Sequence, residues 1–143
     1  MFRSADGAGI DMLYLCGITP TPLDRFGKKR SDFIKTSLGA EDSVPWEHYA
    51  TQSHEEETLS LLKELSEKNF SIVAIEQTTT SIPLYSYTPE ENIAFIVGNE
   101  VEGIPESISS HIDTHLHIPM LGKKESLNVS VAFGIVSYYF SQK

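Results

Sequence analysis

Short apolar runs alternate with segments of helical periodicity along this chain, and that alternation limits its possible folds more than any other feature. The runs are 12–16, 71–76, 93–98 and 115–120. Three of them lack the strict apolar–polar alternation of a half-exposed strand, as expected for parallel strands covered on both faces. The sequence therefore predicts an α/β fold over 1–143, a single domain with a mostly parallel sheet and helices on both faces.

The last run differs from the other three, because His115 and His117 flank Leu116 and give it a polar side. This pattern predicts an edge strand. Helical periodicity is expected over four segments, namely 1–6, 31–37, 54–68 and 127–140. Ser53 and Glu56 have the spacing of a capping box at the start of the third helix.

The last predicted helix is apolar on nearly every face, and Ser126 is its N-cap candidate. Its charge-free stretch, 126–142, is shorter than the roughly 20 mainly apolar residues that a membrane span requires, so no membrane partner is expected. A small domain alone rarely covers such a helix on all sides. We therefore expect a homodimer through this helix, with Val136 and Tyr139 at the interface.

The formal net charge is -9 at pH 7, so the chain as a whole repels the negatively charged phosphates of a nucleic acid. Any RNA contact must be local, and five of the eleven basic residues do gather between positions 25 and 35. These candidate RNA-binding residues are Arg25, Lys28, Lys29, Arg30 and Lys35. A solvated loop is the alternative interpretation. The single cysteine, Cys16, excludes an intramolecular disulfide, and with no secretory signal at the start we expect a cytoplasmic protein.

Two loops that follow predicted strands have features of ligand sites. The stretch GNEVEGIP at 98–105 places two glycines and Glu100 where ligands bind in parallel α/β sheets. The stretch IPMLGKKESLNVSVA at 118–132 brings Ser126 and Asn128 to the start of a buried helix, beside free backbone N–H groups. An ordinary strand-to-helix turn and a plain N-cap are the alternatives that the local pattern leaves open.

These segments, in this order, resemble the SpoU (TrmH-type) branch of the SPOUT RNA methyltransferases. The residues FRSAD at 2–6 are similar to the second half of the family's first motif. The second and third motifs resemble FIVGNEVEGIP at 95–105 and IPMLGKKESLNVSVAFGIVSYY at 118–139. The stretch KTSLGAEDSVPW at 35–46 is also similar to the family. By this resemblance, the family's first strand and the start of its first motif are missing from the chain.

The resemblance implies an α/β domain with a deep trefoil knot at its C-terminal end, an exception to the rule against threaded chains. It implies an obligate dimer that binds S-adenosylmethionine and methylates a ribose 2′-hydroxyl of tRNA or rRNA. Carried over by position, the cofactor-binding residues are Gly98, Ile118, Met120 and Leu127. The catalytic residues are Arg3, Glu100, Ser126 and Asn128, with no metal.

Two other functions compete with this one. The first is a non-catalytic relative with the same fold that binds RNA or the cofactor. The second is a metal hydrolase, suggested by the density of His111, Asp113, His115 and His117, although no further ligand motif supports it. A Rossmann-type enzyme is excluded, because no Gly-x-Gly-x-x-Gly follows a predicted strand.

Overall fold

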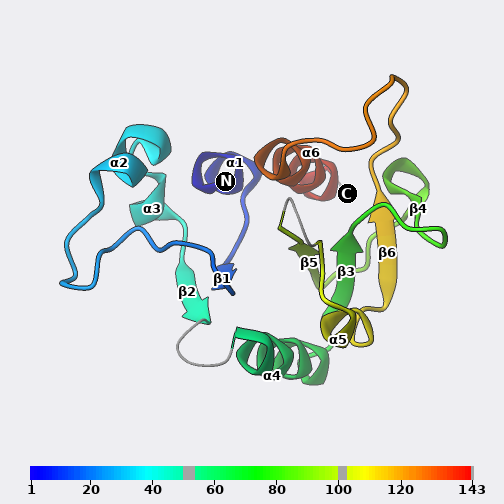
Figure 1. The fold of residues 1–143 in the computed structure, drawn as a ribbon, viewed down its shortest axis with the longest axis horizontal. Coiled ribbons are helices and arrows are strands. Elements are labelled where there is room, and N and C mark those ends of the chain that lie inside the picture. Colours follow the sequence, from blue (N-terminus) through cyan, green and yellow to red (C-terminus); the bar gives the residue numbers. More distant parts are fainter. Residues whose placement is uncertain (50–53, 100–102, 143) are drawn as a thin grey trace.

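The computed structural model describes residues 1–49, 54–99 and 103–142 (of His54, the backbone only), and helices and strands alternate along it (Figure 1). In chain order the elements are α1 (Phe2–Ala8), β1 (Leu13–Cys16), α2 (Ser31–Ser37), α3 (Ala40–Ser43), β2 (Trp46–Tyr49), α4 (His54–Glu67), β3 (Ser71–Ile75), β4 (Ile82–Pro83), the 3-10 helix η1 (Leu84–Ser86), β5 (Ile93–Val97), α5 (Glu106–Ser109), β6 (Thr114–His117) and α6 (Val129–Ser141). All four predicted strands and all four predicted helices are present.

The strands form two parallel sheets. β1 pairs with β2 in a two-stranded sheet, and the other sheet has the order β4-β6-β3-β5. In register, Ile72 and Ala74 of β3 lie opposite Ala94 and Ile96 of β5. All of these strand pairings are parallel, as the sequence predicts.

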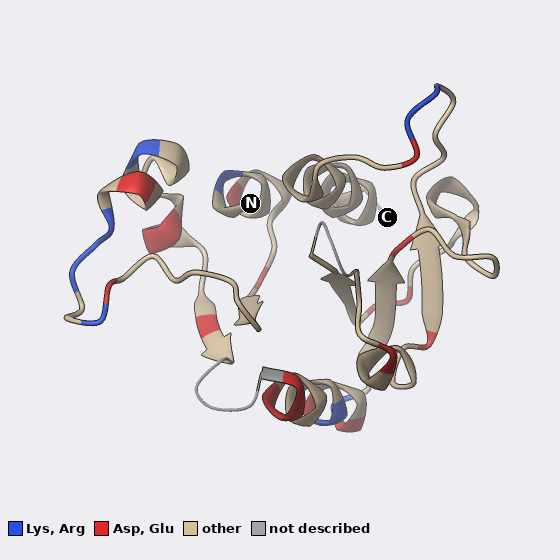
Figure 2. Cartoon of the chain, viewed as in Figure 1, with Lys and Arg blue, Asp and Glu red and all other residues tan. Residues whose placement is uncertain are grey.

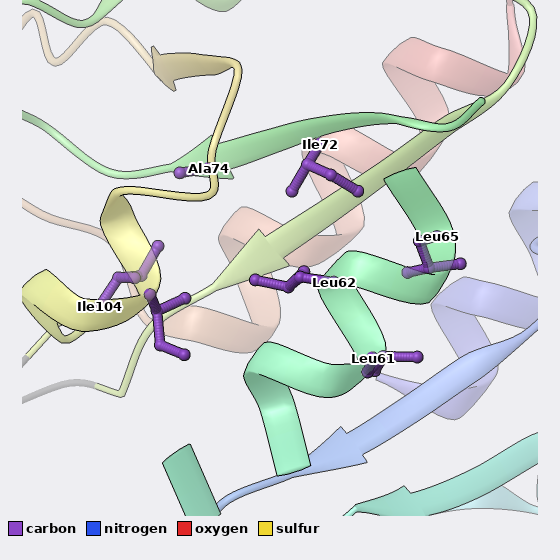
Figure 3. Close-up of a cluster of buried hydrophobic side chains, with 7 residues drawn as sticks. Leu61, Leu62, Leu65, Ile72, Ala74 and Ile104 are labelled. Carbon is purple, nitrogen blue, oxygen red and sulfur yellow. The ribbon is translucent and has the colours of Figure 1, made fainter. Parts of the chain in front are cut away.

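Helices cover both faces of the four-stranded sheet, and β3 shows why. Successive side chains of a strand point to opposite faces. Ile72 and Ala74 pack in one cluster with three leucines of α4, together with residues of the β5–α5 segment (Figure 3). Val73, between them, packs in a second cluster with Leu116 of β6 and Val136 of α6. This continuous burial explains why the strand lacks alternation in its sequence.

Helix α6 packs against α1 as well as the sheet, and the two helices lie side by side in Figure 1. Phe133 of α6 shares a third buried cluster with Phe2 and Ala5 of α1. The contact is close, because a Cβ at Gly7 would collide with the hydroxyl of Tyr138 and one at Gly134 would lie 3.5 Å from Ser4 Oγ. One chain thus covers much of a helix that the sequence analysis assigned to a subunit contact.

Three predictions about these elements were wrong. β6 is not an edge strand, because the two-residue β4 pairs with it on the side away from β3. The N-cap of α6 is Asn128 and not Ser126, since the Asn128 side chain accepts a hydrogen bond from the Ser130 N–H. Val136 is fully buried inside the chain and so does not face a partner, whereas Tyr139 is half-buried, donates a hydrogen bond to the Tyr87 carbonyl at 2.6 Å, and its place at the interface stays a prediction.

The capping-box prediction involves Ser53, which lies outside the described residues. Four short elements were not predicted, namely β2, β4, α3 and α5, and each has five residues or fewer.

Cys16 packs against the first cluster, and burial raises the pKa of its thiol. Among the described residues, no helix has the length and apolar character to cross a membrane.

Candidate functional site

A cavity of 390 Å³ lies where β3, β5 and β6 reach their carboxyl ends. Its walls come from three parts of the chain, namely residues 75–77 after β3, residues 97–99 and 103 after β5, and the segment from 117 to 132 that connects β6 to α6. Ligands of parallel α/β sheets bind at this end of the strands. The topology therefore collects three loops around one space that a ligand can enter.

The β5 loop is closed at its base by a pair of backbone hydrogen bonds. The N–H of Asn99 donates to the Gly103 carbonyl at 3.3 Å, and the N–H of Gly103 donates to the Asn99 carbonyl at 3.2 Å. A Cβ at Gly98 would lie 2.7 Å from the carbonyl oxygen of Gly103, closer than real side chains come. Gly103 has a φ of +68°, which favours glycine. Both glycines are required by this close backbone approach.

Glu76 joins this loop to the strand beside it. Its Oε1 accepts a hydrogen bond from the N–H of Ile104 at 3.1 Å. Its Oε2 lies 3.9 Å from Nδ1 of His115, a buried ring nitrogen that has no hydrogen-bond partner among the described residues. Glu76 thus contacts groups from two of the three strand ends. Glu76 was not among the predicted site residues, although it stands at the end of an apolar strand, the same signal that singled out the 98–105 loop.

The third wall ends where α6 begins. Oδ1 of Asn128 accepts hydrogen bonds from the Ser130 N–H at 2.9 Å and from the Ser130 hydroxyl at 2.6 Å. The cap fixes the direction in which the chain enters the helix. It holds Leu127, Asn128 and Val129 in the cavity wall, and Ala132 lines the cavity one turn further along.

The described residues that line the cavity include two carboxylates and no lysine or arginine. The acids are Glu76 and Glu125, and His117 also lines the cavity, with its Nδ1 3.0 Å from the hydroxyl of Ser81. The remaining walls are mostly apolar side chains and backbone. Such a site favours an apolar or positively charged ligand over an anion.

The family model of the SpoU rRNA Methylase family matches residues 1–138 of the chain. The chain belongs to this family. Among curated relatives, it is 35% identical over 133 residues to the 23S rRNA (guanosine-2′-O-)-methyltransferase RlmB of Blochmanniella floridana, covering 93% of this chain and 47% of that protein. It is 32% identical to RlmB of Escherichia coli K12, covering 93% of this chain and 49% of that one. The chain thus spans about half the length of the curated relatives it matches.

Solved structures agree with this fold. The TrmH/SpoU tRNA modifying enzyme of A. aeolicus superposes with a TM-score of 0.79 at 26% identity, covering 99% of this chain and 65% of that one. The SpoU methyltransferase AviRb of Streptomyces viridochromogenes, solved with AdoMet, has a TM-score of 0.78 at 19% identity, covering 99% of this chain and 53% of that one. The second likeness supports the fold alone.

The structure brings most of the residues predicted from the SpoU motifs to one place. Six line the cavity, namely Gly98, Ile118, Met120, Ser126, Leu127 and Asn128. Glu100 lies outside the described residues. Their assigned roles in cofactor binding and catalysis stay predictions, but their gathering makes this the site to test.

Arg3 is the exception among the residues predicted from the SpoU motifs. It is exposed on α1 and lines a separate hollow of 520 Å³ with Asp6, Leu38 and other residues. It does not line the 390 Å³ cavity. Arg3 therefore lies outside the set of residues that lines the cavity of its own chain.

The basic cluster is less available than the sequence suggested. Lys29 pairs with Asp42 and with Glu41, and its hydrogen bond to Asp42 raises the pKa of the ammonium group. Arg30 pairs with Asp32 at 2.8 Å and lowers the pKa of that carboxyl. Within the described residues no ion pair involves the other members of the cluster, Arg25, Lys28 and Lys35.

The histidines considered for a metal site have other contacts. Asp113 Oδ2 accepts the Ile72 N–H at 2.7 Å, which ties the start of β6 to β3. His115 Nε2 lies 3.3 Å from the Ser109 hydroxyl, and His111 Nδ1 lies 3.0 Å from the Ser110 hydroxyl. Among the described residues, no three side chains of the metal-binding types come together.

Proposed function

We propose that this protein is an S-adenosylmethionine-dependent RNA methyltransferase that methylates a ribose 2′-hydroxyl of tRNA or rRNA in the cytoplasm. The observation that carries the proposal is the cavity, which gathers residues of the second and third SpoU motifs at the carboxyl ends of three parallel strands. The names of the relatives support it, since curated ones are 23S rRNA guanosine-2′-O-methyltransferases and a similar solved protein is a tRNA modifying enzyme.

The residues present fit S-adenosylmethionine. The cavity volume of 390 Å³ lies within the range of about 300–1,000 Å³ typical of small-molecule sites. Gly98, Ile118, Met120 and Leu127 would hold the cofactor through backbone groups and apolar side chains. The carboxylates of Glu76 and Glu125, with no cation beside them among the described lining residues, favour a ligand that carries positive charge.

When bound, the cofactor supplies an electrophilic methyl group on its sulfonium. The chain's own residues position the acceptor, because a 2′-hydroxyl is a weak nucleophile that must lose its proton as it attacks. Ser126 and Asn128 are exposed polar groups at the rim where the third wall meets α6. We assign them to orienting the ribose in line with the methyl group. Glu100 and Arg3 complete the proposed catalytic set.

The proposal includes two features of assembly. The first is a trefoil knot in which the segment after β6 threads the preceding chain, and it follows from the resemblance to the family rather than from the cavity. The second is a homodimer through α6, supported by the exposure of Val131 and Tyr138 on that helix, at 49% and 48%. A second subunit is also one means by which Arg3 could meet a cavity.

Calorimetric titration of the purified protein with S-adenosylmethionine and S-adenosylhomocysteine tests the cofactor site. We expect saturable binding of both. Single-turnover transfer of labelled methyl groups to bulk tRNA and rRNA, followed by mapping of 2′-O-methylated nucleotides, then tests the reaction. No heat with either ligand would contradict the proposal at its first step.

The position of Arg3 favours a second candidate, a non-catalytic relative that binds the cofactor or RNA. Arg3 lies on α1 and outside the cavity, so the described residues of one chain do not assemble the full catalytic set. Cofactor binding without methyl transfer to any RNA fraction would select this candidate. Methyl transfer by the wild type that Arg3→Ala removes would exclude it.

A further inference from the structure

The loop between β1 and α2 ends in a compact turn, residues 24–28, which we call the basic tip. The Asp24 N–H donates to the Lys28 carbonyl at 2.8 Å, and the Gly27 N–H donates to the Asp24 carbonyl at 3.0 Å. Oδ1 of Asp24 accepts from the N–H groups of Phe26 and Lys28 at 2.8 and 2.9 Å. Leu23 and Lys29 pair directly below this turn. The basic tip is therefore a turn whose backbone is held in place by hydrogen bonds.

Phe26 projects from the basic tip with 72% of its surface exposed. The guanidinium carbon of Arg25 lies 4.7 Å from the centre of its ring, so the arginine covers one face. A partner that covers this ring would remove apolar surface from water, which is favourable. An aromatic ring beside an arginine is the combination on which unstacked nucleobases stack.

The charges around Phe26 select an anionic partner. Arg25 and Lys28 flank the ring and form no ion pair within the described residues, whereas Lys29 and Arg30 do. The chain as a whole is acidic, at a net charge of -9, and Figure 2 shows the Lys and Arg colour concentrated along this loop. A polymer that offers a flat base and a phosphate at each unit matches this pattern better than an acidic peptide, whose charged side chains carry no ring.

We propose that the basic tip binds an unstacked base of single-stranded RNA, with Phe26 stacking on the base and Arg25 and Lys28 contacting the adjacent phosphates. The proposal rests on the proposed function only in taking RNA as the partner. It adds a contact site outside the cavity that selects loops or single strands over duplex, since bases in a duplex are already stacked.

Fluorescence anisotropy with a labelled oligo(A) strand, alone and annealed to oligo(U), tests the proposal on the whole chain. We expect Phe26→Ala and Phe26→Leu to weaken single-strand binding on the order of tenfold, the scale of losing one base–aromatic stack, and to leave duplex binding nearly unchanged. Phe26→Tyr should bind like the wild type because it keeps the ring. Ile18→Ala, at another exposed apolar residue of the same loop, is the matched control.

Salt dependence separates stacking from charge. The Phe26 variants should keep the wild-type slope of affinity against salt, because a phenyl ring releases no counterions. Arg25→Ala and Lys28→Ala should each flatten that slope. In Phe26→Trp, the new indole's emission should be quenched on addition of oligo(A), beyond any change in the wild type.

Three results would overturn the proposal. One is equal affinity of the wild type, Phe26→Ala and Phe26→Leu for the single strand. Another is equal weakening of single-strand and duplex binding by these variants. The third is a shift of Phe26→Ala to a smaller species in sedimentation, which would make the basic tip a contact between copies of the chain. Failure of the proposed function has a different signature, since the wild type would then lack cofactor binding or methyl transfer.

Discussion

Glu76 and Ile104 are joined by a hydrogen bond in which Oε1 of the carboxylate accepts the backbone N–H at 3.1 Å. The bond connects the end of β3 to the base of the loop that follows β5. Since Gly98, Asn99 and Gly103 of that loop line the cavity, the carboxylate holds one wall of the candidate cofactor site in position.

Glu76→Ala should therefore lower stability and also weaken cofactor binding. An unsatisfied donor costs about 1–3 kcal/mol, so we expect the Kd for S-adenosylhomocysteine to rise on the order of tenfold. Glu76→Gln keeps an acceptor oxygen and should recover most of the affinity. Titration calorimetry measures both, with Glu90→Ala at an exposed position as the control. Wild-type affinity in Glu76→Ala would refute the role given to this bond.

Gly98→Val should abolish cofactor binding, for a reason that differs from simple crowding of a ligand. Its Cβ would lie 2.7 Å from the carbonyl oxygen of Gly103 and 2.8 Å from that residue's Cα, so the loop must move. Gly122→Ala is the matched control, because a Cβ there meets nothing within 4 Å. Calorimetry reports binding, and circular dichroism checks that cooperative unfolding persists. Binding retained by Gly98→Val would show that the loop adapts.

Two valines on α6 should respond differently to the same substitution. Val136 has no exposed surface, so Val136→Asp buries a charge among apolar side chains and should destabilise the domain by at least about 3 kcal/mol. Val131 is 49% exposed, so Val131→Asp should leave the domain folded and shift it from dimer to monomer. Thermal melts and sedimentation distinguish the two. A wild type that is monomeric at micromolar concentration would contradict the dimer.

Arg3→Ala should leave cofactor affinity unchanged, because Arg3 does not line the cavity of its own chain. If Arg3 contacts the reacting ribose or its phosphate, methyl transfer should fall on the order of a hundredfold, the scale of losing one transition-state contact. Arg3→Lys should restore little, since an ammonium cannot reproduce bidentate contacts. Single-turnover transfer measures the rate, and Lys63→Ala on α4 is the control. Equal rates in all variants would remove Arg3 from the catalytic set.

The sequence predicted the elements that are long or continuously apolar. β3 was recognisable because Ile72, Val73 and Ala74 are buried against helices on both faces. β4 was not, because two residues that include a proline carry no periodicity. The motifs also identified six residues of the cavity wall. Glu76 also stands at the end of an apolar strand, but it was missed because its contact with Ile104, 28 positions away, is not encoded in any local pattern.

The position of α6 has a consequence for how cofactor binding and dimerisation affect each other. Its cap and first turn, through Asn128, Val129 and Ala132, belong to the cavity wall, while Val131 and Tyr138 on the same helix remain exposed. If the dimer forms through that exposed face, one rigid helix is shared by the ligand and the partner subunit. Thermodynamic reciprocity then requires that any factor by which dimerisation tightens cofactor binding is the factor by which the cofactor tightens the dimer.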